Sequence, residues 1–69
     1  MEKYKRLKAE LRRLKISYTD IATEINRSYS YVGKCLSGHN SGFLIAEGYA
    51  ILLLIRQPAE RFNYYFLET

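Results

Sequence analysis

The sequence predicts a small all-α domain of five helices. Apolar residues recur at intervals of three and four in four of its segments, the period of helices that bury one face. Ser17, Ser28 and Pro58 stand where helices would begin, since Ser caps free backbone N–H groups and Pro fits a first helical turn. With 69 residues, the chain is expected to form one domain, residues 1–69, near the lower size limit for a core without disulfides or metal.

The composition argues against several kinds of protein. Apolar residues make up 48% of the chain, a normal share for a globular domain. The single cysteine, Cys35, cannot form an internal disulfide and falls on a predicted inner helix face, which favours the reducing cytoplasm. Because His39 is the only histidine, no metal and no other cofactor is expected. The charged N-terminus shows no secretory signal, and the longest apolar run, residues 49–55, is too short to span a membrane, so we expect a soluble protein.

The first expected helix covers residues 2–14. One apolar stripe runs along it with spacings of three, four and three, formed by Tyr4, Leu7, Leu11 and Leu14. Lys5 and Lys8 are typical of a solvated helix face. Three further cations stand where this helix leads into the next, namely Arg12, Arg13 and Lys15. Residues 1–15 hold seven Lys or Arg and two Glu, a net +5, and the rest of the chain nets −1, so the basic segment favours an anionic polymer as partner.

The centre of the chain, residues 18–36, is predicted to form two short helices joined by a tight corner. Ser17 caps the first helix, and Asp20, three residues on, sits at the positive end of its dipole. The inner face of this helix carries, at helical spacing, Ile21, Ala22 and Ile25. Ala22 is small enough to let a second helix cross closely.

Small polar residues define the corner and the second helix. Asn26 tolerates the left-handed backbone that a sharp turn needs. Ser28 then caps a helix over residues 29–37, which stops at Gly38. The residues that this helix buries are expected to be Val32, Cys35 and Leu36, with Tyr31 packing at the edge of the bundle.

The last third of the chain, residues 43–69, is unusually apolar. A fourth helix is expected over residues 43–56, and its second half is apolar on all sides, which predicts burial on all sides. Pro58 suits the first turn of a fifth helix, one side of which carries Ala59, Phe62, Tyr65 and Phe66. A monomer this small has no obvious cover for so much apolar surface, so a partner subunit is expected. Two alternatives stay open: a monomer that dimerises only on its polymer partner, with rings that fold back on the first helix, and, less favoured, rings that bind a small ligand.

The spacing of the central helix pair matches a known motif. The motif begins with a small residue, Ala22, and has a turn former four positions later, Asn26. A β-branched residue follows six positions further on, Val32, and an apolar residue three positions beyond that, Cys35. The stretch resembles the DNA-binding helix-turn-helix of lambda repressor, Cro and xenobiotic-response-element type regulators over roughly residues 7–55. The family usually has Gly at the corner and often Gln where this chain has Tyr18. The resemblance implies a five-helix lambda-repressor-like domain that binds double-stranded DNA.

The resemblance also implies which residues face DNA. Base-reading positions on the second helix of the motif are Ser28, Tyr29, Ser30, Gly33 and Lys34. Phosphate-contacting positions are Arg12, Arg13, Lys15, Tyr18, Thr19, Arg27, His39, Asn40 and Ser41. Gly33 is explained either by close approach of the helix backbone to the groove or by close packing against the first helix. The loop at residues 39–42 is either a phosphate contact or a plain connector.

The function implied is that of a small Cro-like transcriptional repressor of a phage or mobile element. It would act on an operator as a homodimer, because one recognition helix reads too few base pairs. The expected location is the nucleoid in the cytoplasm of a bacterial or phage-infected cell. The interface between subunits is expected at Ile55, Phe62, Tyr65 and Phe66.

A different function class stays open beside DNA binding. Pairs of short helices are common in small bundles, and only a minority bind DNA, so the alternative is a protein-binding helical module, an inhibitor or adaptor. An enzyme is not expected, because no paired acid and base, no nucleophile arrangement and no glycine-rich phosphate loop is visible. No small-molecule ligand is expected either.

Overall fold

The computed structural model describes residues 3–67, and this part of the chain is helical and contains no strand. The helices, in chain order, are α1 (Lys5–Leu14), α2 (Tyr18–Ile25), α3 (Tyr29–Ser37) and α4 (Ile45–Leu54), followed by a 3₁₀ turn (Ala59–Arg61) and a π-helical stretch (Asn63–Leu67). The all-α prediction is therefore confirmed. The fifth helical element, residues 59–67, is called the C-terminal segment below.

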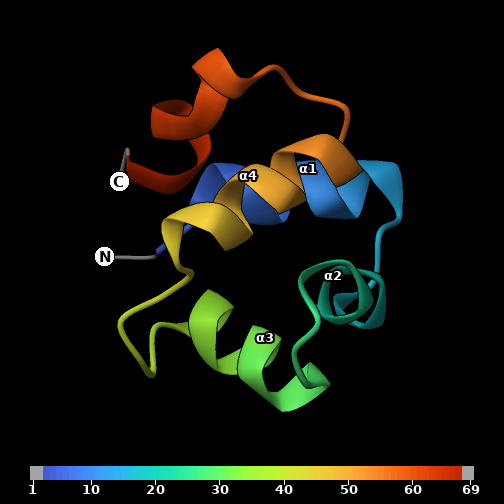
Figure 1. Cartoon of the computed structure of the whole chain (residues 1–69), viewed down its shortest axis with the longest axis vertical. Coiled ribbons are helices and arrows are strands. Elements are labelled where there is room, and N and C mark those ends of the chain that lie inside the picture. Colours follow the sequence, from blue (N-terminus) through green and yellow to red (C-terminus); the bar gives the residue numbers. More distant parts are fainter. Residues whose placement is uncertain (1–2, 68–69) are drawn as a thin grey trace.

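The helices enclose one apolar core. Figure 1 shows α1 and α4 crossing the middle of the view, with α2 and α3 on one side and the C-terminal segment on the other. α2 packs against both α3 and α4, while the C-terminal segment packs against α1 and α4. The core side chains come from every element, namely Tyr4, Leu7, Leu11, Ile21, Ala22, Val32, Leu36, Ile51, Leu52, Ile55, Tyr65 and Phe66. The pair α2–α3 thus forms one edge of the molecule, and α3 lies at the end of the view opposite the C-terminal segment (Figure 1).

Local chemistry sets the ends of α2 and α3 as the sequence predicts. Ser17 Oγ accepts the Asp20 N–H at 3.2 Å, and an Asp20 carboxylate oxygen accepts the Ser17 N–H at 3.0 Å. Asn26 ends α2 with left-handed backbone, φ 58°, and Ser28 Oγ accepts the Tyr31 N–H at 3.0 Å. Both caps satisfy backbone N–H groups that a helix start leaves without partners. Only three residues, 26–28, separate α2 from α3, which makes the corner sharp.

The start of α1 differs from the predicted helix 2–14, whose first position lies outside the described residues. The helix begins at Lys5, because Tyr4 takes left-handed backbone with φ 56° and turns its ring into the core. There the Tyr4 hydroxyl oxygen accepts the Phe43 N–H at 3.0 Å. Leu14, predicted to complete the buried stripe, is 36% exposed, because the stripe turns away from the core at the helix end. Tyr4 therefore lies before the helix and holds the loop after α3 through the hydrogen bond from Phe43.

The prediction that α4 is buried on all sides is wrong. The helix is shorter than residues 43–56, and its inner side carries Ile51 and Leu52, both fully buried. Leu53 is 75% exposed, and Tyr49 is still 42% exposed although its ring stacks on Phe62 of the C-terminal segment. An exposed stripe with a spacing of four residues results, formed by Ile45, Tyr49 and Leu53, which we call the α4 stripe.

The C-terminal rings fold back onto the start of the chain, as one of the open alternatives has it. The rings of Phe66 and Tyr4 lie 5.8 Å apart edge to face, and those of Phe62 and Phe66 are stacked at 5.0 Å. Pro58 lies just before the 3₁₀ turn, with the extended backbone of a cap. Among the rings that follow, Tyr65 and Phe66 are buried and Tyr64 is 39% exposed. This arrangement closes the core without a second subunit.

Candidate nucleic-acid interface

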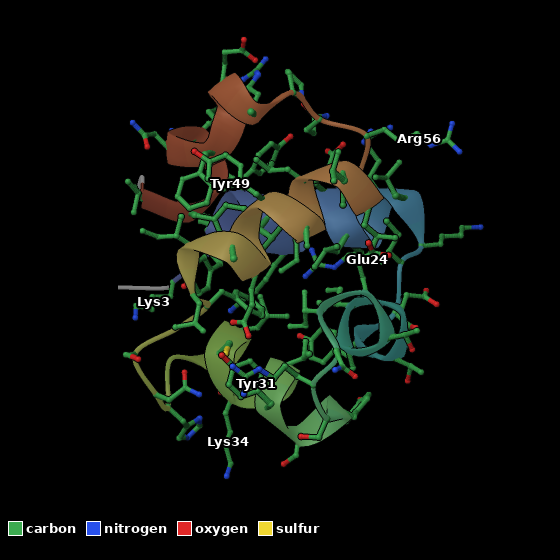
Figure 2. All side chains as sticks on the ribbon, viewed as in Figure 1. Lys3, Glu24, Tyr31, Lys34, Tyr49 and Arg56 are labelled. Carbon is green, nitrogen blue, oxygen red and sulfur yellow. The ribbon has the colours of Figure 1, made fainter. Side chains whose placement is uncertain are left out.

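α3 presents one side to solvent along its whole length. All five predicted base-reading residues lie on or beside this side: Ser28, Tyr29, Ser30 and Lys34 are exposed, and Gly33 is half-buried. Figure 2 shows Lys34 pointing away from the body of the molecule, on the edge opposite the C-terminal segment. The side chains of Ser30 and Lys34 make no hydrogen bond to residues 3–67. Their donors and acceptors are thus open to another molecule.

Gly33 has no packing role in this chain. A Cβ placed on it would meet no atom within 4 Å among the described residues. Close packing against the first helix is thereby excluded as the reason for this glycine. Close approach of α3 to a groove stays a prediction.

A shallow depression joins the exposed side of α3 to the loop that follows it. Its lining residues are Ser28, Ser30, Tyr31, Lys34, His39 and Asn40. The structure therefore brings predicted base-reading residues together with two predicted phosphate contacts. His39 Nδ1 lies 2.6 Å from Ser37 Oγ, and Asn40 Oδ1 accepts the Gly42 N–H at 2.8 Å. The His39–Ser37 contact holds the start of the loop against the end of α3, and Lys3 Nζ, which donates to the Ser41 carbonyl oxygen at 3.3 Å, ties the loop to the segment before α1.

A buried carboxylate ties α3 and the corner to α4. Glu47 is 7% exposed, and its Oε1 accepts both the Tyr31 hydroxyl at 2.7 Å and the Leu44 N–H at 2.9 Å. Its Oε2 accepts Arg27 Nε at 2.7 Å. Burial alone would raise the pKa of Glu47, but these three donors outweigh it and the pKa is lowered. The corner, α3 and the start of α4 therefore meet at one charge.

Tyr31 lies at the edge of the bundle as predicted, and its hydroxyl group donates a hydrogen bond to Glu47. Burial first, and then the hydrogen bond to Glu47, raise the pKa of the Tyr31 hydroxyl. Its ring packs edge to face on Phe43, with the centroids 6.5 Å apart. Tyr31 thus connects the buried carboxylate to the depression beside α3.

The predicted phosphate contacts from the end of α1 to the start of α2 are divided between two places. Arg12 and Tyr18 line one small depression between α1 and α2, together with Lys8, Leu11 and Ile16. Lys15 and Thr19 are exposed close by in the chain. Arg13 is placed elsewhere: it forms a two-bond pair with Glu10 and lines a separate depression with Leu14, Leu54 and Arg56. The bond from Arg13 lowers the pKa of Glu10, and it engages the cation that a phosphate would need.

Three of the four residues predicted for the dimer interface are buried by their own chain. Ile55 is 2% exposed, Tyr65 6% and Phe66 9%. They fill the core because the C-terminal segment folds back on α1, so a second folded subunit cannot reach them. Phe62 is half-buried between Tyr49 and Phe66. The exposed apolar surface of this region lies instead on the α4 stripe and at Leu44, Tyr64 and Leu67.

Sequence reasoning missed Glu47 and the α4 stripe. Glu47 stands alone as an acidic residue in the first turn of an otherwise apolar helix, which is a signal for a capping carboxylate. The stripe has a spacing of four residues that periodicity detects, but uniform hydrophobicity of the segment hides which side is covered.

Comparison with protein-family models, with curated proteins and with solved structures finds no match to this chain. Within the described residues, no helix is long and apolar enough to cross a membrane. Across residues 3–67 no three side chains among His, Cys, Asp and Glu gather as a metal site would need.

Proposed function

We propose that this protein binds double-stranded DNA through the exposed side of α3, as a small lambda-repressor-like, Cro-like transcriptional repressor. One observation carries the proposal: α3 lies at one edge of the molecule, both its ends are capped, and its exposed side holds the Ser30 and Lys34 side chains, which make no hydrogen bond to residues 3–67. The placement of Ala22, Val32 and Cys35 in the core and of Asn26 at the corner supports it, since those positions carry the resemblance.

The chemistry of this surface suits limited base reading with strong backbone contact. Lys34 can donate to guanine O6 or N7 or to a phosphate, and Tyr29 can offer its hydroxyl and its ring. The rings of Tyr29 and Tyr18 lie 5.8 Å apart, so the starts of α2 and α3 present an aromatic pair on one side. Long bidentate readers are lacking on α3, so phosphate contacts and DNA shape supply much of the affinity.

A titration of a fluorescent duplex of mixed sequence tests the proposal. Binding should be detectable at low salt and weaken steeply as salt rises, with log K falling by about 0.9 per phosphate contact for each unit of log salt. A Ser30→Ala, Lys34→Ala variant should bind more weakly, whereas Glu60→Gln, on the opposite edge, should bind like the wild type. Absent binding at low salt would refute the proposal.

The biological site of action follows from the same proposal. A Cro-like repressor acts by occupying a promoter, and for a phage or mobile element the operator lies beside the repressor's own gene. A footprint on that flanking DNA is the expected result. Protection confined to distant genes would contradict a self-contained switch.

The α4 stripe supports a second copy of this chain as the partner. Ile45 is 70% exposed and Leu53 75% exposed, and apolar side chains in a continuous row are typical of protein interfaces. Sedimentation at micromolar concentration should give a mass near twice 8.1 kDa that falls to the monomer on Leu53→Asp. The same change at Phe66 would be uninformative, because that ring is in the core. A mass of 8.1 kDa for the unmodified chain would refute the dimer.

The same stripe also favours the second candidate function, a protein-binding helical module. In that case the stripe would bind a different protein, and α3 would have no role in DNA binding. A monomer that ignores duplex DNA at low salt is the combined result that would select this function over the first.

A further inference from the structure

The Arg27 side chain is fixed at one edge and open at the other. Its Nε donates to Glu47 at 2.7 Å, and its guanidinium carbon lies 4.7 Å from the centre of the Tyr31 ring. The terminal nitrogens make no hydrogen bond within residues 3–67, and the side chain is 44% exposed. Two nitrogens with four N–H donors therefore face solvent from a guanidinium held by two groups behind it.

The position of this open edge suits a phosphate. Arg27 directly precedes Ser28, the cap of α3, and no acidic residue stands in the first turn of that helix. The positive end of the helix dipole therefore adds to the charge of the guanidinium. A guanidinium matches the two oxygens of a phosphate with parallel hydrogen bonds. A mobile surface Arg loses side-chain freedom when it grips a phosphate, whereas here that freedom is already lost on folding.

We propose that Glu47 is a positioning residue that holds Arg27 as a preformed fork for a DNA phosphate beside the start of α3. The inference rests on the proposed function and adds to it a buried residue that contacts no DNA. It also assigns Tyr31 a part, since its ring and hydroxyl complete the support behind the fork. A positioning role would explain why the Glu47 carboxylate, a negative charge, lies beside a surface that is proposed to bind a polyanion.

The direction in which one substitution changes the affinity for DNA distinguishes a positioning role of Glu47 from a purely electrostatic one. Glu47→Gln removes a negative charge next to the DNA surface, so charge alone predicts tighter binding. Positioning predicts weaker binding, because the amide holds Arg27 less firmly. Glu24→Gln is the matched control, because it removes the same charge from an exposed side chain on α2 that makes no hydrogen bond to the described residues.

The experiment measures duplex binding against salt for the wild type, both Gln variants, Arg27→Gln and the double variant of Glu47 and Arg27. Arg27→Gln should weaken binding about tenfold or more and reduce the salt slope by about 0.9. Glu47→Gln should also weaken binding, and the double variant should be no weaker than Arg27→Gln alone. The control should bind as tightly as the wild type or slightly more so. Binding by Glu47→Gln that equals or exceeds the wild type would overturn the inference.

Two further measurements keep every outcome decisive. In proton–nitrogen NMR without DNA, the Arg27 Nε proton should exchange slowly with water and give an observable signal. This signal should be lost in Glu47→Gln and kept in Glu24→Gln. Fast exchange of the Arg27 Nε proton in the wild type would overturn the inference that Glu47 holds Arg27 in place. If Glu47→Gln does not fold, Arg27→Lys replaces it, because Lys keeps the charge but lacks the fork, and wild-type affinity for that variant would overturn the inference. A wild type that ignores duplex DNA refutes the proposed function instead, which is a distinguishable result.

Discussion

Gly33 and Gly48 lie inside helices, yet the structure predicts different responses to the same substitution. In Gly33→Ala the new methyl group meets no atom within 4 Å, so only helix propensity changes. The free energy of unfolding should rise by about 1 kcal/mol, which raises Tm by about 4–8 °C for a domain of this size. In Gly48→Ala the methyl carbon would stand 2.6 Å from Cε2 of Phe62. That ring is stacked on Tyr49 at 4.5 Å and on Phe66 at 5.0 Å, so it cannot move without losing ring contacts.

The difference in the free energy of unfolding between the two variants measures the cost of crowding Phe62 with the new methyl group. Both gain the same helix propensity, which cancels, and crowding of this kind costs about 1–3 kcal/mol. Gly48→Ala should therefore be less stable than Gly33→Ala by about 1–3 kcal/mol. Urea unfolding followed by circular dichroism measures the gap, and a Phe62→Leu background, which removes the ring, should narrow it. Equal stability of the two variants would show that Phe62 does not pack on α4 as described.

Three further predictions follow from α3, the corner and the buried carboxylate. Lys34→Ala should lower the salt slope of duplex binding by about one in fluorescence anisotropy; an unchanged slope removes Lys34 from the interface. Because the pKa of Glu47 is lowered on folding, its contribution to stability is complete above its unfolded pKa of about 4.3 and is lost as pH falls towards the folded value. Denaturant midpoints across that window should fall less steeply in Glu47→Gln, and parallel curves would contradict this. Asn26→Val should lower stability by about 1 kcal/mol or more, since a β-branched residue is disfavoured at φ 58°, and Asn26→Gly should not; equal thermal midpoints would count against the left-handed corner.

The features that sequence predicted well depend on near neighbours in the chain. Ser17 with Asp20, Asn26, and Ser28 each act within four residues, so their roles at helix ends are readable locally. The buried side of α3 follows for the same reason, because its apolar residues have helical spacing. These elements decide the exposed side of α3, and so the predicted base-reading residues fall on one surface.

The features that sequence could not predict depend on segments far apart in the chain. Glu47 receives donors from the corner, from α3 and from the start of its own helix, and only folding brings them together. Tyr4 leaves the α1 stripe because its hydroxyl reaches the loop 39 residues later. Tyr65 and Phe66 look like exposed apolar surface until the C-terminal segment folds onto α1.

The claim that α3 is the DNA-binding surface is tested most directly by mapping backbone amide shifts in proton–nitrogen NMR while a short duplex is added at low salt. The account predicts the largest changes at residues 27–34 and 39–41, with little change along the α4 stripe. Changes confined to the α4 stripe, or no change at any amide, would contradict it.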